Sequence, residues 1–231
     1  FNGIPFFSAD TSSIYTTDVS GTDDTATGNS AYGYQAMDAI TTGDNNTAVG
    51  YASLTANTTG AFNAAFGAFS LDINSTGSDN TALGASALGA NTTGNYNVAV
   101  GRAALSSNTT GTRNLAIGYA AYDGSDTEND NIAIGYEAMT TNTAGGENNV
   151  AIGNYTMDAL TSADANVAIG HYALGAVTTG GTNTAVGYEA LATMTDATRN
   201  TAVGKSALQN ATGSFNTAVG SAALENNSTG A

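Results

Sequence analysis

A glycine returns at an almost constant interval along this chain. It lies in near-identical stretches such as NTAVGYEAL, residues 183–191, and NTAVGKSAL, residues 200–208. Of the eleven intervals between the twelve glycines, nine are 17 residues long, one is 18 and one is 16. The glycines are Gly33, Gly50, Gly67, Gly84, Gly101, Gly118, Gly135, Gly153, Gly170, Gly187, Gly204 and Gly220. A unit this short cannot bury a core alone, so the copies must stack on one another.

Positions within the repeat are numbered here from this glycine as zero. Asn stands at −4 and Ala at −2 in all twelve copies, with a large apolar residue at −1 and Leu, Met or Tyr at +4. A further Gly often follows at +10, after Thr or Ser. Thr, Val and Ile favour strands, whereas clusters of Asn and Gly favour tight turns. The pattern predicts an all-β fold, a β-solenoid (β-roll) of about twelve 17-residue coils.

The Asn at −4 is expected to form a ladder along the stack. Each Asn lies above the previous one, so its amide can donate to one neighbour and accept from the other. A turn-capping role is the alternative, and the two interpretations are compatible. The predicted ladder consists of Asn29, Asn46, Asn63, Asn80, Asn97, Asn114, Asn131, Asn149, Asn166, Asn183, Asn200 and Asn216.

The segment from −4 to 0 carries no charge in any copy. Alternate residues of a strand face opposite sides, so one face can line the thin core of the coil while positions −3 and −1 face away. A strand that is apolar on both faces is normally buried on both. We therefore expect several chains side by side around one axis, with interface residues Val49, Val100, Ile117, Ile134, Ile152, Ile169, Val186, Val203 and Val219.

The N-terminal residues 1–24 lack the repeat, which occupies residues 25–231. The stretch SSIYT is interpreted as a degenerate capping coil with Ile14 at −2 and Tyr15 at −1. Before it, FNGIPFF groups several apolar side chains that either cap the first coil or dock on a neighbouring subunit. The docking candidates are Phe1, Ile4, Phe6 and Phe7.

The charge and composition of the chain argue against several functions. Its net charge of −15, from 19 acidic and 4 basic residues, disfavours nucleic acids and anionic membranes as partners. No apolar run is long enough to predict a membrane span. There is no Cys, and Ser occurs in no nucleophile motif with a plausible His partner. We expect no enzymatic activity, no catalytic residues and no cofactor.

A single histidine and an acidic stretch are the two remaining candidates for a functional site. The single His, His171, stands at +1 where other coils have Tyr, which predicts a stacked surface residue. The acidic stretch DGSDTENDN carries oxygens of the kind that Ca²⁺ binds, but it lacks EF-hand spacing. A solvated acidic loop is therefore preferred, and its weak candidate ligands are Asp123, Asp126, Glu128 and Asp130.

The motif N-T-A-V-G-Y-x-A-L-x-x-N-T-T-G resembles repeats in bacteriophage tail-fibre proteins. It is also similar to the N-S-x-A-I-G repeat in the heads of trimeric autotransporter adhesins, which are left-handed β-rolls of three chains. The resemblance covers residues 25–231, and the 17-residue period is longer than that of the adhesin heads. It implies a structural or adhesive fibre segment, either a trimeric tail-fibre or a surface-adhesin shaft, on a virion or outside the cell.

Two alternatives to this function remain. One is a subunit of an extracellular filament stacked end to end through its N-terminal segment. The other is a carbohydrate- or ice-binding solenoid, although the Thr pairs at +8 and +9 are adjacent and do not present two flat rows. The expected partner is the chain itself, as a homotrimer or filament, together with a host-surface glycan or protein.

Overall fold

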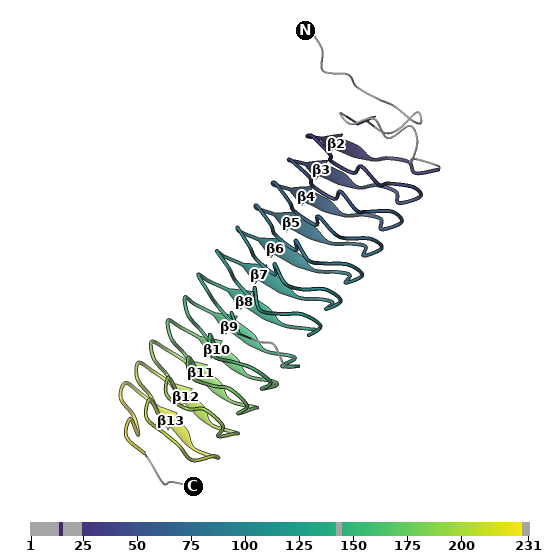
Figure 1. Cartoon of the computed structure of the whole chain (residues 1–231). Coiled ribbons are helices and arrows are strands. Elements are labelled where there is room, and N and C mark those ends of the chain that lie inside the picture. The colour runs from purple at the N-terminus through teal and green to yellow at the C-terminus, as the bar shows by residue number, and fades with distance from the viewer. Residues whose placement is uncertain (1–13, 16–24, 142–144, 228–231) are drawn as a thin grey trace. The chain divides into compact units, whose positions relative to one another are not determined.

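The computed structural model describes residues 14–15, 25–141 and 145–227, and in these ranges every regular element is a strand (Figure 1). The chain divides into two compact units, residues 1–113 and 114–231, which are described separately. The strands of the first unit are β1 (Ile14–Tyr15), β2 (Ser30–Tyr32), β3 (Thr47–Val49), β4 (Ala64–Phe66), β5 (Thr81–Leu83) and β6 (Val98–Val100). Those of the second are β7 (Leu115–Ile117), β8 (Ile132–Ile134), β9 (Val150–Ile152), β10 (Val167–Ile169), β11 (Thr184–Val186), β12 (Thr201–Val203) and β13 (Thr217–Val219).

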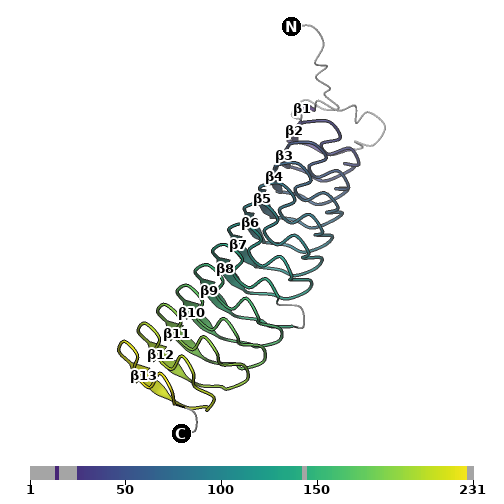
Figure 2. The ribbon, with the colours of Figure 1, turned by 60° about the vertical axis from the view of Figure 1, so that its left-hand side comes forward.

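Within each unit the strands pair in parallel and in chain order. Equivalent residues of successive copies face each other, as in Ala48↔Ala65 between β3 and β4 and Ala168↔Ala185 between β10 and β11. Each copy therefore contributes one coil, whose strand stacks directly on the strand of the previous coil (Figures 1 and 2). This confirms the predicted β-solenoid.

The register of β1 differs from the prediction by one residue. Ile14 pairs with Ser30 and Tyr15 with Ala31, which places Ile14 at −3 and Tyr15 at −2. Tyr15 is fully buried, whereas Ile14 is 56% exposed. The separation in sequence between β1 and β2 is thus one residue shorter than the repeat predicts, because the Tyr15 ring points into the core and Ile14 faces outward.

The interior of each coil is lined by three sets of side chains. Asn at −4 and Ala at −2 point inward from the strand, and the Leu, Met or Tyr at +4 points inward from the opposite segment. The buried residues at +4 are Met37, Leu54, Leu71, Leu88, Leu105, Tyr122, Met139, Met157, Leu174, Leu191 and Leu208. Small Ala side chains on the strand leave room for these larger ones in a thin core.

Three non-glycine positions in the coils have left-handed backbone conformation. They are +2, +4 and +12, for example Ala52 (φ 51°), Leu54 (φ 51°) and Phe62 (φ 58°). The inversions direct backbone N–H groups alternately toward the two neighbouring coils. The N–H of Ala52 donates to Tyr34 in the previous coil (2.9 Å), and that of Leu54 donates to Ser70 in the next (3.0 Å). Hydrogen bonds between coils thus hold a conformation that costs about 1–2 kcal/mol per residue.

The glycine at position zero is required by the stacking. At Gly187, with φ of 138°, a Cβ atom would lie 2.6 Å from the carbonyl carbon of Gly204 in the next coil. The other glycines of this row that have a following coil in their unit show the same close approach. Only a residue without a side chain fits there, which explains why the repeat keeps its Gly.

Candidate functional site

An exposed row of apolar side chains follows the outer side of the sheet in each unit. We call the side chains at −3 and −1 of β2–β13 the outer sheet face. Because strand residues alternate, these side chains point away from the core while Ala at −2 points into it. Leu83 is 50% exposed, Ile117 37% and Val219 72%.

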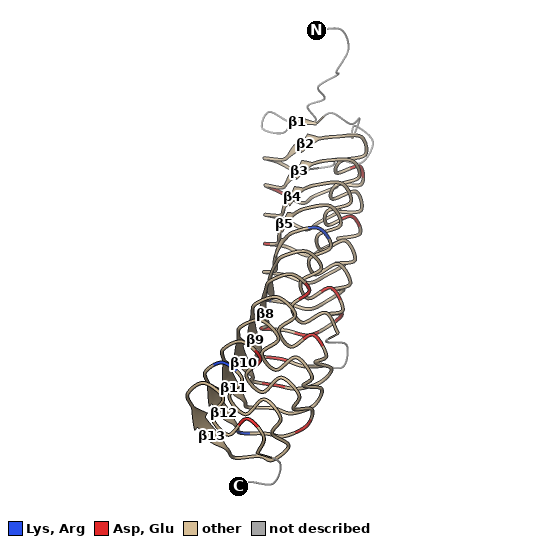
Figure 3. Cartoon of the chain, turned by 90° about the vertical axis from the view of Figure 1, so that its left-hand side faces the viewer, with Lys and Arg blue, Asp and Glu red and all other residues tan. Residues whose placement is uncertain are grey.

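All nine interface residues predicted from the sequence lie at −1 on this outer sheet face. Five are exposed and the other four are half-buried by their own unit. None of the strands β2–β13 contains a charged residue. Figure 3 shows the same division, with the acidic and basic residues on the other segments of the coils. Contact of this face with another chain stays a prediction.

The Asn side chains at −4 form a continuous hydrogen-bonded row inside each unit. The Oδ1 atom of each Asn accepts from the backbone N–H of the Asn in the next coil, as from Asn46 to Asn29 (2.8 Å) and from Asn183 to Asn166 (2.8 Å). The Nδ2 group mostly donates across its own coil, as from Asn46 to the carbonyl of Gly60 (2.9 Å). Most of these Asn residues therefore both link successive coils and close their own coil.

A second Asn row, at +7, was not anticipated from the sequence. In the first unit Asn74 donates to Asn57 (3.0 Å), Asn91 to Asn74 (2.7 Å) and Asn108 to Asn91 (2.9 Å), through Nδ2 and Oδ1. In the second unit this position holds Asn142 and Asn227 but also Ser125, Leu160, Val177, Met194 and Ala211, so the Asn row is not continued from coil to coil. The signal was present in the NTTG segments, but Asn before Thr and Gly is equally typical of an exposed turn.

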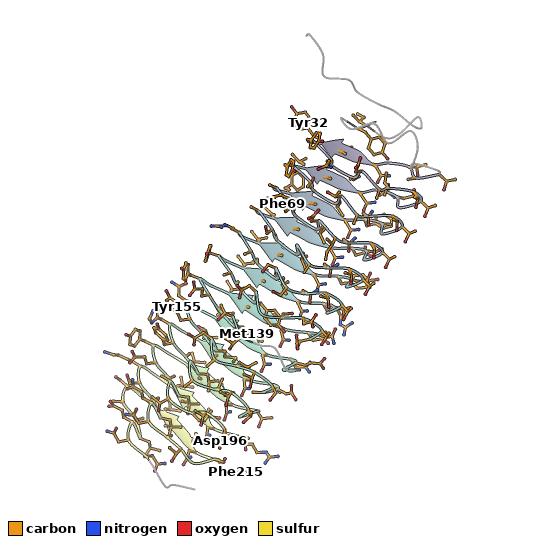
Figure 4. The ribbon with its side chains drawn as sticks, viewed as in Figure 1. Tyr32, Phe69, Met139, Tyr155, Asp196 and Phe215 are labelled. Atoms are coloured by element: carbon orange, nitrogen blue, oxygen red, sulfur yellow. The ribbon has the colours of Figure 1, made fainter. Side chains whose placement is uncertain are left out.

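Aromatic rings at +1 and +2 border the outer sheet face. In the second unit the rings of Tyr155 and Tyr172 stack at 5.1 Å, and that of Tyr136 meets Tyr155 edge-on at 5.5 Å. Tyr155 is labelled in Figure 4. A hydrogen bond with the carboxylate of Glu137 raises the pKa of the Tyr136 phenol. His171 belongs to the same stack, parallel to Tyr188 at 5.4 Å. Its Nδ1 atom is buried and has no hydrogen-bond partner.

Two carboxyl groups near this border are partly desolvated. Burial raises the pKa of Asp123 and of Asp158, and the negative charge of Glu137 adds to the effect on both. Their carboxylates are thus less stable than those of solvated acids, which makes the local charge sensitive to mildly acidic pH.

The acidic loop of the second unit does not gather its carboxylates. Glu128 turns inward, and its carboxylate accepts from the backbone N–H groups of Asp126 (2.8 Å), Thr127 (3.1 Å) and Gly145 (3.0 Å). Asp126 and Asp130 are exposed. In the described parts of the chain no group of three or more His, Asp or Glu side chains is arranged to hold a metal ion.

The docking candidates Phe1, Ile4, Phe6 and Phe7 lie outside the described residues. The described segments also contain no helix that is long and apolar enough to cross a membrane.

No family model, curated protein or solved structure matches the chain.

Proposed function

We propose that this chain is a structural segment of an extracellular or virion fibre, in which three copies associate through their outer sheet faces. The observation that carries the proposal is the combination of exposure and composition on that face. Its Val, Ile, Leu and aromatic side chains are partly exposed in coil after coil, and no strand of the repeat carries a charge. Contiguous apolar surface of this kind is typical of protein–protein contacts.

The energetics of the face favour association. Covering a half-exposed Val or Ile contributes on the order of 1 kcal/mol. These β-branched side chains on strands are already confined to few rotamers, so ordering them costs little. The gain is repeated in every coil, and a fibre segment therefore becomes more stable with each added repeat.

Charge restricts which surfaces can meet. Every copy has a net charge of −15, so copies repel one another wherever acidic segments come together. The outer sheet face is the surface on which identical copies can approach without placing like charges in contact. Three copies around one axis bring the three faces together and leave the charged segments outside. The resemblance of the motif to trimeric adhesin heads favours this number over two.

The hydroxyls at +8 argue against an ice-binding role. Thr58 Oγ1 donates to the carbonyl of Ser75 (3.0 Å), and Thr178 Oγ1 donates to that of Thr195 (3.2 Å). The side-chain hydroxyls of residues 41, 75, 92 and 161 donate in the same way to backbone carbonyls of the next coil. A row that uses its hydroxyls to join coils offers fewer of them to water or ice.

The test is the mass of the protein in solution, measured by light scattering, together with images of single particles. We expect a trimer. In the double variant Ile169→Asp, Val186→Asp, two carboxylates stand on the outer sheet face of neighbouring coils. Since an unpaired buried charge is very costly in a contact, this variant should become a monomer.

Two control variants separate loss of association from loss of folding. Thr76→Asp with Thr93→Asp adds the same charges at exposed positions away from the strands and should remain a trimer. Ala168→Asp buries a charge inside the coil and should lose the β-sheet circular dichroism signal. A wild-type monomer, or long filaments unaffected by the outer-face variant, would contradict the proposal.

A further inference from the structure

The second unit has a polar groove along the turn segment from +9 to +12. It is lined by Ser162, Asp164, Thr179, Gly181, Thr182, Thr198 and Arg199, and its volume is about 320 Å³. This volume lies in the range of small-molecule sites, but the lining is hydroxyl-rich and charged instead of apolar. In Figure 4, Asp196 and Phe215 mark this side of the coils, across the strands from Tyr155. We call it the turn-edge groove.

Two backbone donors in the turn-edge groove have no partner. Elsewhere a polar side chain at +11 accepts from the N–H at +11 of the previous coil, as Ser78 does for Ala61 (3.0 Å). Ser214, at the equivalent +10 position after the 16-residue interval, does the same for Thr198 (3.0 Å). Gly181 has no side chain to offer. In the described structure the N–H groups of Asp164 and Gly181 make no hydrogen bond, although both residues line the groove.

A guanidinium group lies at the same place. Arg199 is one of only four basic residues, and within the described residues it forms no ion pair with a carboxylate. Its guanidinium carbon lies 5.2 Å from the ring centroid of Phe215, which orients the side chain. Arg199 and the N–H groups of Asp164 and Gly181 line the same groove, and such a set of donors is suited to bind a carboxylate.

The rest of the lining is suited to hydroxyl groups. The side-chain oxygens of Ser162, Thr179 and Thr198 form no hydrogen bond within the described structure. One carboxylate oxygen of Asp164 accepts from the N–H of Glu147 (2.8 Å), which fixes this side chain as a further acceptor. The groove thus combines one anion-binding corner with several donors and acceptors for a polyhydroxylated ligand.

We propose that the turn-edge groove binds an acidic sugar. The sugar carboxylate pairs with Arg199 and the free N–H groups of Asp164 and Gly181, while its hydroxyls meet Ser162, Thr179 and the Asp164 carboxylate. A single carboxylate fits better than a polyanion, because the net charge of −15 repels highly charged ligands. The inference goes beyond the fibre role and does not depend on how copies associate.

The first experiment titrates the full chain with galacturonic acid, galactose and acetate, followed by NMR or calorimetry. Galacturonic acid should bind, and galactose and acetate should each bind about tenfold or more weakly, because each lacks part of the contact set. Galactose binding as tightly as galacturonic acid would refute the role of the Arg corner. If acetate bound as tightly as galacturonic acid, the groove would be a simple anion site that does not recognise the sugar, and the proposal would be wrong. The absence of saturable galacturonic acid binding would also overturn it.

Matched variants locate the site. Arg199→Gln should weaken galacturonic acid binding about ten- to hundredfold, the effect of one lost charge-assisted contact. Arg113→Gln changes the same coil position in the first unit, where Asn95 and Tyr96 stand in place of Gly181 and Thr182, and should have no effect. Equal losses in both variants would refute the assignment.

A third variant fills the groove without removing a charge. Gly181→Ser introduces the residue type that Ser78 and Ser214 supply at the equivalent position of their coils, and its hydroxyl can accept from the N–H of Asp164. It should keep the wild-type melting temperature and oligomeric mass but abolish binding. Unchanged binding in a folded Gly181→Ser variant would overturn the proposal. Loss of the fibre assembly, in contrast, would be seen in the mass alone, so the two proposals fail separately.

Discussion

Replacing one Asn inside the stack tests what holds the coils together, and Asn63 bonds to the coils on both sides of it. Its Nδ2 group donates to the carbonyl of Gly77 (2.8 Å) and to Asn46 Oδ1 (3.1 Å). Its Oδ1 atom accepts from the backbone N–H (3.0 Å) and the Nδ2 group (3.2 Å) of Asn80. The side chain is almost completely buried. Asn63→Ala removes these bonds where water cannot replace them.

The expected cost follows from the groups that lose their partners. The backbone N–H of Asn80 loses its acceptor, and an unpaired buried group of this kind costs about 1–3 kcal/mol, whereas the carbonyl of Gly77 keeps Asn74 Nδ2 as a donor (2.9 Å). We therefore expect the free energy of unfolding to fall by about 1–3 kcal/mol, before any cavity term. Asn95→Ala is the control: its Nδ2 group donates to Thr93 (3.0 Å) and its Oδ1 atom accepts from the N–H of Ser78 (2.8 Å), but water can reach this partly exposed side chain, so the loss there should stay at about 1 kcal/mol or less.

Urea denaturation followed by circular dichroism measures both variants against wild type. Similar losses in Asn63→Ala and Asn95→Ala would refute the view that the inner row is structural. Asn63→Asp adds a pH test, because it keeps the acceptor but places a carboxylate beside the Gly77 carbonyl. Burial should raise the pKa of the new Asp in the folded state above its unfolded value. Stability should then be highest at low pH and fall as pH rises between the two pKa values.

Three other changes test separate parts of the coil. Gly187→Ala should cost about 3 kcal/mol or more in unfolding free energy, because its methyl would lie 2.6 Å from a carbonyl carbon, whereas Gly175→Ala, whose closest contact is 3.3 Å, should cost less. Burial raises the pKa of Asp158 in the folded state above its ordinary 3.8, so the folded state binds this proton more tightly than the unfolded state. The stability that the protonated group contributes is lost as pH rises from 3.8 through the folded-state pKa. Thermal melts should therefore show Asp158→Asn gaining on wild type from pH 4 to pH 7. Deleting residues 81–97 should leave a folded protein one coil shorter, and deleting only residues 81–88 should destabilise it by misaligning strands and turns.

The sequence period was sufficient to predict the strands and their pairing. A constant interval places equivalent residues on top of one another, so Ala48 opposite Ala65 follows from counting. The alternation around the strand likewise predicted which side chains face outward. At β1 this reasoning was wrong by one residue, because that segment has neither the Asn at −4 nor the Gly at zero to fix the register. Burial of Tyr15 decided it instead.

Features that depend on neighbouring coils were not predictable from local preferences. Leu has no intrinsic preference for the left-handed conformation, yet Leu54 and its equivalents adopt it because the next coil accepts their N–H groups. The turn-edge groove was missed for a related reason. In the sequence Gly181 is an ordinary turn residue. Only the structure shows that its missing side chain leaves the N–H of Asp164, in the same groove, without an acceptor among the described residues.

Burial in this protein is a property of the stack and not of the single coil. Leu208 is fully buried at +4, but the equivalent Leu224 in the coil of β13 is 52% exposed among the described residues. The two residues differ in whether another coil lies over them. The left-handed positions follow the same logic, because their cost is offset by hydrogen bonds that only a neighbouring coil can supply. A repeat of this kind gains stability by extension along its axis, and its uncharged outer sheet face lets it gain further by lateral association.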